Sequence, residues 1–270
     1  MYAFAKLLSA LSLLAVANAF YVPKARANTP PANRPTGGSI CSTTAFLVET
    51  VIPADINDNG GEPFPPSPIT TYPTYTALSV GTQNYTCGDD GAWTGSGAIT
   101  YLYDISCLPL DHHQPFTSFI AALWDAAPPT VTAADIVALT EQVNPGVGYG
   151  IHYWIPDPVN ATSGNIYAKW DFSQSERMEN DTNKANAYLV AGESANVPAP
   201  NDPSVNSNWL VEPVLVINGK KAGQLADQVF RINSNGGQAP NTTCTPGTDL
   251  QVKSTLDFLF YGGAWADTIF

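Results

Sequence analysis

Two residues carry side chains suited to catalysis or ligand binding, His152 and Arg231. His152 lies in the aromatic run Tyr149–Trp154. It is either a general base in a cleft or a hydrogen-bonded structural group, and the structural role is the commoner one beside aromatic residues. Arg231 lies in a β-like run and is expected to pair with a buried acid or, alternatively, to bind an anionic ligand. Sequence alone assigns no reaction to either residue.

Acidic and aromatic side chains offer two further kinds of site. Asp157, Asp171 and Glu176 contain the carboxyl groups that glycoside hydrolysis requires, provided that two of them lie at a catalytic separation. Four tryptophans could form a surface that stacks on sugars, although packing inside the protein is the commoner role of tryptophan. These tryptophans are Trp93, Trp154, Trp170 and Trp209.

Two segments contain ligand types that metal ions prefer. Asp55, Asn57 and Asn59 place oxygens at alternate positions, as in the first half of a calcium loop. The twelfth position is Pro66 instead of Glu, which excludes an EF-hand and leaves a looser calcium site or a surface turn. Adjacent histidines in Asp111–His113 are poorly placed to bind one metal, so a solvated loop is expected there.

Several large functional classes are excluded. The chain has no GxGxxG motif between a strand and a helix, no P-loop, no HExxH and no GxSxG motif. Nucleotide cofactors are therefore not expected. The formal net charge of −12 argues against nucleic acid, because phosphate binding requires clustered Lys and Arg.

The N-terminus has the features of a secretory signal peptide. Lys6 precedes the apolar run Leu7–Val16, and Ala17–Ala19 matches a small-x-small cleavage pattern. The run is too short to cross a bilayer as a helix, so no transmembrane segment is expected. We expect a signal peptide at 1–19, an extended Pro-rich arm at 20–40 and a single β-rich domain at 41–270.

Cysteines and glycosylation sequons also indicate export. Four cysteines predict two disulfides with three possible connectivities. They are Cys41, Cys87, Cys107 and Cys244. Four Asn-x-Thr sequons predict a eukaryotic glycoprotein with exposed asparagines. The expected glycosylation sites are Asn84, Asn160, Asn180 and Asn241.

Short β-like segments account for most of the chain. Each is rich in β-branched or aromatic residues and bounded by turn-forming residues. The expected strands are 43–51, 76–87 (two short strands or one bulged strand), 98–105, 150–155, 166–172, 209–217, 228–232 and 255–261. Helices are expected at 116–124 and 136–143, the second opened by a capping box of Thr132 and Asp135. The pattern predicts a mainly β protein, a single antiparallel β-sandwich or barrel-like domain.

Charge is distributed unevenly along the chain. No Lys or Arg occurs between Pro35 and Ala168, whereas that stretch contains twelve Asp and Glu. The remaining C-terminal part contains seven bases, Arg231 among them. The N-terminal acids must therefore be balanced by water, backbone amides, calcium or these seven bases. If the bases face the acids across the sheets, both halves form one domain.

Several of these segments together resemble a known family. They include Gly81–Cys87, the strand after Gly97, Gly150–Tyr153 and Gln228–Pro240, in that order. The resemblance is to the secreted fungal and bacterial family called domain of unknown function 3455. It covers about residues 76–262, and its most specific parts are TQNYTC at 82–87 and the stretch 231–240.

The resemblance implies one β-rich domain and structural use of the cysteines, and it implies no activity. Fungal members often carry the label malate dehydrogenase. This sequence does not support that label, because it lacks a dinucleotide fingerprint and a parallel α/β pattern. Residues 108–147 depart from the family pattern, so the expected helices lie in an insertion.

We therefore expect a secreted, N-glycosylated, disulfide-bonded fungal protein for which the sequence establishes no catalytic activity. It would act in the extracellular space, at the cell wall or at a host surface, with a cell-wall polysaccharide or a host-surface component as its partner. Two alternatives remain open. One is an extracellular hydrolase or lyase that uses His152 with nearby acids, and the other is a carbohydrate-binding module that uses exposed tryptophans.

Overall fold

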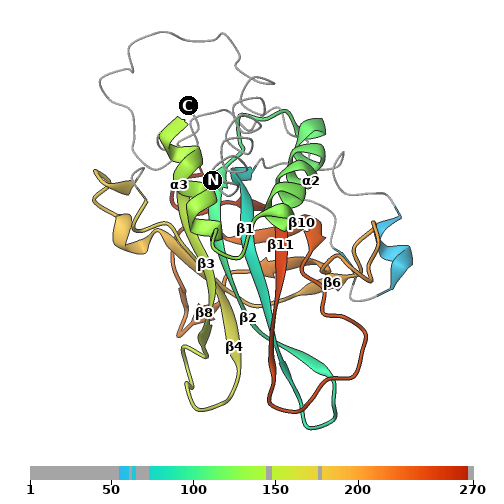
Figure 1. The fold of residues 1–270 in the computed structure, drawn as a ribbon. Coiled ribbons are helices and arrows are strands. Elements are labelled where there is room, and N and C mark those ends of the chain that lie inside the picture. The colour runs from blue at the N-terminus through green and yellow to red at the C-terminus, as the bar shows by residue number, and fades with distance from the viewer. Residues whose placement is uncertain (1–54, 61–62, 65–72, 144–147, 176–177, 267–270) are drawn as a thin grey trace.

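Nine antiparallel strands form one sheet in the computed structural model, which describes residues 55–60, 63–64, 73–143, 148–175 and 178–266 (Figure 1). The order across the sheet is β5-β4-β3-β2-β1-β11-β10-β7-β6. The strands are β1 (Pro73–Cys87), β2 (Trp93–Asp104), β3 (Gly148–Pro156), β4 (Ile166–Asp171), β5 (Tyr188–Ala191), β6 (Ala195–Val197), β7 (Trp209–Pro213), β10 (Gln228–Gly236) and β11 (Asp249–Tyr261). A separate hairpin joins β8 (Val216–Ile217) to β9 (Lys220–Lys221), and short 3-10 helices lie at η2 (Ile56–Asn59) and η4 (Lys184–Asn186).

The long strand β1 is the centre of the sheet. It pairs with β2 on one side and with β11 on the other, and a bulge between Asn84 and Tyr85 interrupts its register with β2. A single bulged strand was one of the two expectations for this segment. Gly81 lets β2 approach closely here, because a Cβ atom on it would lie 2.1 Å from the carbonyl oxygen of Ile99.

The sheet curls until its two ends meet. β5 and β6 stand at opposite ends of the strand order, yet only Gly192–Ser194 connects them. Ala191 forms a bridge with Val214, which directly follows β7. The Leu215 amide also donates to the Val190 carbonyl oxygen over 2.9 Å. The fold is therefore barrel-like, which confirms the mainly β class and selects the barrel-like form over the two-sheet sandwich.

Two helices cover the outer face of the sheet, α2 (Leu110–Ala126) and α3 (Ala133–Val143) (Figure 1). Both lie within residues 108–147, as expected, and α2 is longer than the predicted 116–124. Leu78, Val80 and Tyr103 point outward from the sheet and pack under these helices with Ile120 and Trp124 of α2. Burial of this apolar surface is what stabilises the helices on the sheet.

Hydrogen bonds fix both helices. Thr117 of α2 donates its hydroxyl to the buried carboxyl group of Asp257 over 2.6 Å, and the Asn233 amide donates to the same carboxyl over 2.8 Å. At the start of α3 the Thr132 amide donates to the Asp135 carboxylate over 2.8 Å, and the Asp135 amide donates to the Thr132 hydroxyl over 3.2 Å. This reciprocal pair confirms the predicted capping box.

Inside the curl, one end of the barrel is filled with aromatic side chains. Tyr149 and Phe172 stack with ring centroids 4.9 Å apart, and Tyr75 packs edge-on against both rings. Phe258 and Phe260 of β11 join the same cluster. Because these residues fill the interior at this end, open interior space remains only toward the other end.

The structure corrects part of the predicted strand pattern. Segment 209–217 is not one strand, because β7 ends at Pro213 and β8 begins a separate hairpin. The Asn218–Gly219 pair, whose sequence is typical of a tight turn between strands, joins β8 to β9, and both residues have positive φ angles, 51° and 76°. The short strands β5 and β6 were not predicted, and the expected strand 43–51 lies outside the described residues.

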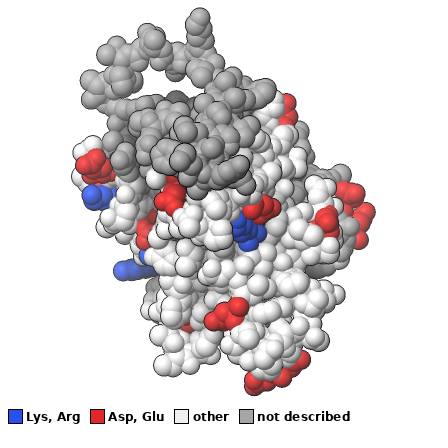
Figure 2. Space-filling view, in the orientation of Figure 1, with Lys and Arg blue, Asp and Glu red and all other residues white. Residues whose placement is uncertain are grey.

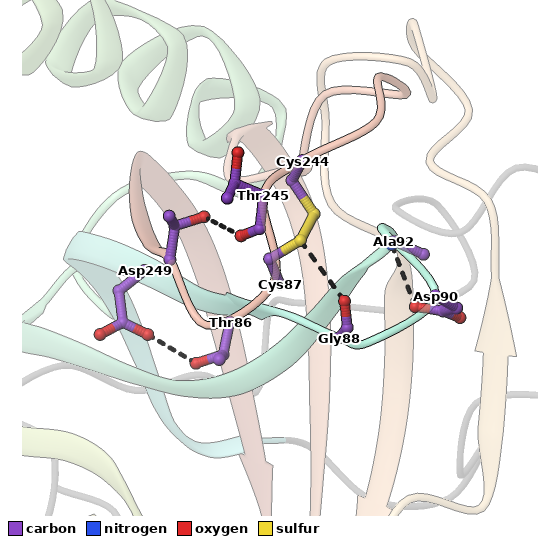
Figure 3. Close-up of a disulfide and its surroundings, with 9 residues drawn as sticks. Thr86, Cys87, Gly88, Asp90, Ala92, Cys244, Thr245 and Asp249 are labelled. Atoms are coloured by element: carbon purple, nitrogen blue, oxygen red, sulfur yellow. Dashed lines mark hydrogen bonds between the residues drawn. A yellow bond between two sulfur atoms is a disulfide. The ribbon is translucent and has the colours of Figure 1, made fainter.

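Figure 3 shows a disulfide between Cys87 at the end of β1 and Cys244 in the loop before β11, with Cα atoms 5.9 Å apart. Cys107 is disulfide-bonded as well, and Cys41 lies outside the described residues. No helix in the described ranges is long and apolar enough to cross a membrane.

Acidic side chains outnumber basic ones on the face shown in Figure 2. The ion pairs found among the described residues join Lys169 to Asp171 and Lys221 to Asp227. Both pairs are local and lie in the C-terminal half. Of the options for balancing the N-terminal acids, pairing with bases across the sheets is therefore not the one that these two lysines use.

Lys253 of β11 reaches across to the C-terminus of α2. Its ammonium group donates to the carbonyl oxygens of Trp124 over 2.6 Å and of Ala127 over 3.2 Å. A cation at this end satisfies carbonyl groups that the helix leaves unbonded and interacts favourably with the helix dipole.

We predict that Lys253→Met lowers the free energy of unfolding by about 1–2 kcal/mol, since it removes these hydrogen bonds while keeping the chain length. Urea unfolding followed by circular dichroism measures the change. Lys220→Met removes an exposed lysine of β9 and should change stability by less than about 0.5 kcal/mol. Equal losses in the two variants would contradict the prediction.

Candidate functional site

A polar pocket of about 470 Å³ opens inside the barrel at the end opposite the aromatic cluster. Its walls come from β1, β2, β3, β4, β5, β6, β7 and β10 and from the link between β5 and β6, so it exists only because the sheet curls. The lining side chains include five amides, two carboxylates, one guanidinium and several aromatic or aliphatic groups. Pockets of this size and mixed lining are typical binding sites for small molecules.

Arg231 provides the positive charge of the pocket. It lies on β10, is 9% exposed, and donates from Nε and Nη2 to the Asn208 carbonyl oxygen over 3.0 and 2.6 Å. Burial lowers the pKa of Arg231 from its ordinary value, and the nearby Glu212 charge opposes this change. Its other N–H groups have no partner among the described residues. The expected ion pair between Arg231 and a buried acid is therefore wrong: its partner among the described residues is a backbone carbonyl oxygen, and the side chain lines the pocket.

Glu212 lies on β7 beside Arg231 and was not among the predicted site residues. Leu210 is the cross-strand partner of Arg231, and Glu212 follows Leu210 by two positions on the same face. The side chain is 5% exposed, and no described residue hydrogen-bonds to it. Burial raises the pKa of Glu212 to about 7, and Arg231 partly opposes the increase whereas Glu193 adds to it.

A chain of hydrogen bonds orders the wall beside these charges. The Asn208 side-chain amide donates to the Asn196 oxygen over 2.7 Å, and the Asn196 amide donates to the Glu193 carboxylate over 3.0 Å. Because Arg231 holds the Asn208 carbonyl oxygen, the chain continues from Glu193 to the guanidinium. Each group is thus oriented before any ligand arrives, which lowers the entropy cost of binding.

Aromatic residues also line the pocket. Trp154 of β3 is half-buried and packs against the interior core, with Gly97 of β2 next to it. Tyr85 donates its hydroxyl to the Gly237 carbonyl oxygen over 2.5 Å. Burial raises the pKa of Tyr85 above its ordinary value. Its hydroxyl therefore remains neutral and serves as a donor.

The two most specific segments of the family resemblance meet at this pocket. Gln83, Asn84 and Tyr85 come from the TQNYTC run, and Arg231 and Gln238 come from the 231–240 stretch. Gly236 and Gly237 in that stretch have positive φ angles, 72° and 85°, which glycine adopts without strain. This turn redirects the chain after β10 and so brings Gln238 to the pocket.

His152 lies beneath the pocket and does not line it. Its ring stacks on Trp170 at 4.5 Å and meets Phe258 edge-on at 5.3 Å. Nδ1 lies 3.0 Å from the Lys169 carbonyl oxygen, so Nδ1 carries the proton. Burial lowers the pKa of His152 to about 3, and the charge of Arg231 lowers it further. The interpretation of His152 as a hydrogen-bonded structural residue is supported over the general base.

Of the other predicted acids, the two that the structure describes have separate local partners. Asp171 is held by Lys169 at 2.8 Å, whereas Asp157 accepts the backbone amides of its own loop at Val159 and Asn160. Glu176 lies outside the described residues. The carboxylates that do come together are Glu193 and Glu212, both of which line the pocket.

The predicted metal segments have other roles. Asn57 binds the backbone of Phe64 through both ends of its amide, so its oxygen is already used. The expected loop at Asp111–His113 is wrong, because these residues begin α2. His113 is fully buried and its Nε2 contacts the Leu108 carbonyl oxygen. Among the described residues, no three His, Cys, Asp or Glu side chains cluster as a metal site.

The four tryptophans have different environments. Trp170 and Trp209 are buried in separate hydrophobic clusters, and Trp93 is half-buried outside the pocket. Trp154 alone of the four lines the pocket. The expectation of a shared stacking surface therefore reduces to one residue.

Sequence reasoning missed Glu212, Glu193, Asn196 and Asn208. One signal was present in WLVEP at 209–213, where Glu212 is a lone acid that alternates with Leu210 in a β-like run. An acid at an inward position of a strand is rare unless it is paired or functional.

A model of the family described as "Protein of unknown function (DUF3455)" matches residues 68–262. No curated protein and no solved structure matches the chain. The matched range contains every residue that lines the pocket.

Glu212 predicts a specific dependence of stability on pH. A folded-state pKa of about 7, against 4.5 in the unfolded chain, means that its stabilising contribution is complete below pH 4.5 and is lost as pH rises through 7. His152 acts in the opposite direction, because its lowered pKa contributes stability above pH 6.5 that is lost as pH falls toward 3.

We predict that Glu212→Gln, which removes only the first effect, gains stability relative to the native protein between pH 5 and pH 8. The gain is on the order of 3 kcal/mol. Urea unfolding at both pH values measures it, and His152 cancels in the difference. Glu193→Gln removes an exposed carboxylate of the same wall and should leave the difference near zero. A similar gain in both variants would show that Glu212 is not the responsible group.

Proposed function

Because the chain belongs to the family described as Protein of unknown function (DUF3455), a name that assigns no activity, we propose from the pocket itself that this is a secreted saccharide-binding protein. It acts outside the cell, at a cell wall or at a host surface, and holds one end or one short stretch of a glycan inside the barrel.

The observation that carries this proposal is the composition of the pocket. Five amide side chains, Arg231 and two carboxylates surround Trp154 in one concave site. Sugars present hydroxyl groups that both donate and accept, together with apolar C–H faces that pack on aromatic rings. A pocket that combines amides, charges and one indole matches both features.

Two further observations support an extracellular site of action. The disulfide between Cys87 and Cys244 closes a segment of 157 residues, and such bonds form and persist in oxidising compartments. The expected signal peptide at residues 1–19 lies outside the described residues and remains a proposal.

The hydrolase or lyase alternative has less support. It requires His152 as a base, but His152 lies beneath the pocket, where its ring stacks on Trp170 and meets Phe258 edge-on. A base with a pKa of about 3 is also poorly matched to proton abstraction at neutral pH.

We predict that the purified protein is retained on at least one of chitin, β-glucan and cellulose. We also predict that Trp154→Ala lowers its affinity for soluble oligosaccharides about tenfold or more, which corresponds to roughly 1.4 kcal/mol of binding free energy. Isothermal titration calorimetry measures the change. Trp93→Ala, which removes a half-buried indole outside the pocket, is the matched control. Absence of binding to all three polysaccharides and their oligosaccharides would overturn the proposed function.

The asparagines of the four glycosylation sequons differ in their exposure to solvent. Asn160, Asn180 and Asn241 are exposed outside the strands, whereas Asn84 is half-buried in β1 and lines the pocket. We predict that protein secreted from a eukaryotic host carries glycans on the first three asparagines and none on Asn84. Peptide mapping after enzymatic deglycosylation in heavy-oxygen water identifies the occupied sites. A glycan on Asn84 in ligand-binding protein would contradict the placement of the saccharide in this pocket.

A further inference from the structure

We propose that Arg231 and Glu212 form a recognition subsite for a neutral group that accepts one hydrogen bond and donates another, such as two neighbouring hydroxyls of a sugar. The inference rests on the proposed function and extends it by naming the ligand class, an uncharged saccharide instead of an acidic or an amino sugar.

The side chains of Arg231 and Glu212 lie on neighbouring strands but do not form an ion pair. They occupy the same face of adjacent strands, and each changes the pKa of the other through its charge. No ion pair within 4 Å joins them, although such pairs occur elsewhere among the described residues. Arg231 is instead anchored to the Asn208 carbonyl oxygen. An anchored guanidinium and a carboxyl group therefore face the same pocket with a gap between them.

Both groups retain unused hydrogen-bonding capacity. Arg231 keeps N–H donors that no described residue accepts, and Glu212 is 95% buried without any hydrogen bond from a described residue. Both residues line the pocket, where solvent reaches their free polar atoms. A ligand that replaces this solvent must supply matching hydrogen bonds to both groups, or it loses affinity.

The guanidinium of Arg231 and the carboxyl group of Glu212 together favour a neutral ligand group between them. A hydroxyl oxygen accepts from the guanidinium while a hydroxyl hydrogen donates to the carboxylate, and an N-acyl amide does the same through its C=O and N–H. A carboxylate or phosphate ligand would meet the guanidinium but would be repelled by Glu212, by Glu193 and by the formal net charge of −12. An ammonium ligand would be attracted by Glu212 and Glu193, but it has only donors and so cannot accept a hydrogen bond from Arg231.

The charged and titratable groups around Glu212 come from several elements. They are Arg231 on β10, Glu193 in the link between β5 and β6, and, facing Arg231, Tyr85 on β1 and His152 on β3. Tyr85 and His152 are neutral near pH 7, because burial raises the pKa of the first and lowers that of the second. The ionisation of Glu212 therefore dominates any change in the pocket between pH 5 and pH 8.

The test uses the full secreted protein and three sets of soluble oligosaccharides of matched length. One set carries hydroxyls and N-acetyl groups only, the second carries uronic carboxylates, and the third carries free amines. We expect neutral oligosaccharides to bind at least tenfold more tightly than either charged set. Cello-oligosaccharides compared with N-acetylated ones then distinguish a hydroxyl pair from an amide.

Two variants test the residues themselves at pH 8. Glu212→Gln should weaken neutral binding at least tenfold, whereas Glu193→Gln, which removes an equal charge from the same pocket, should change it less than threefold. In the native protein the affinity should also rise as pH increases through 7, and this rise should be absent in Glu212→Gln. Circular dichroism confirms that both variants are folded.

The outcomes separate this inference from its premise. The subsite proposal is overturned if the protein prefers uronic or amine-bearing saccharides, or if Glu212→Gln binds neutral saccharides with unchanged affinity. Neither result would contradict the proposed saccharide binding itself. Failure of every oligosaccharide to bind overturns the proposed function and the subsite together.

Discussion

Closure of the curled sheet at Gly192–Ser194 is the constraint on which the rest of this structure depends. This short link connects β5 to β6, the strands at opposite ends of the sheet order. It is held by hydrogen bonds from Gly192 to the Pro213 carbonyl oxygen and from Ser194 to the Val211 carbonyl oxygen. Because the link cannot span a flat sheet of nine strands at ordinary strand spacing, the sheet must curl. The same link carries Glu193 into the pocket, so the closing element and the candidate site are one feature.

Closure also places polar groups in the interior of the barrel. As a result, the interior changes from aromatic at one end to polar at the other. At one end the aromatic cluster around Tyr75 and Phe172 excludes water. Next comes a layer in which His152 stacks on Trp170 and pairs across the sheet with Thr100. The hydroxyl of Thr100 and the indole nitrogen of Trp170 have no hydrogen-bond partner among the described residues. This gradation favours a ligand that enters from the polar end and stops above His152.

The local sequence pattern was sufficient to predict most strands. The alternation of buried and exposed residues, and the turn-forming residues that bound each strand, both lie within a few neighbouring positions of the sequence. The capping box of α3 and the turn at Asn218–Gly219 are of this kind. β5 and β6 escaped prediction because strands of four and three residues carry too little alternation to be recognised. The pocket was not predictable for a different reason. Glu212 and Arg231 lie 19 positions apart in the sequence, and only the register between β7 and β10 brings them together.

The uneven charge of the chain has a simpler explanation than pairing across the sheets. Acids of the base-free stretch such as Asp89, Asp111 and Asp125 are exposed, and water solvates them without a counter-ion. A buried acid is found in the C-terminal half. It is Asp257, whose carboxyl group accepts hydrogen bonds from Thr117 and Asn233. Arg231 is likewise satisfied in part by a carbonyl oxygen instead of an acid. Bases were therefore not needed to neutralise the first half. The buried base of the second half, Arg231, likewise neutralises none of these acids through an ion pair among the described residues and instead lines the interior pocket.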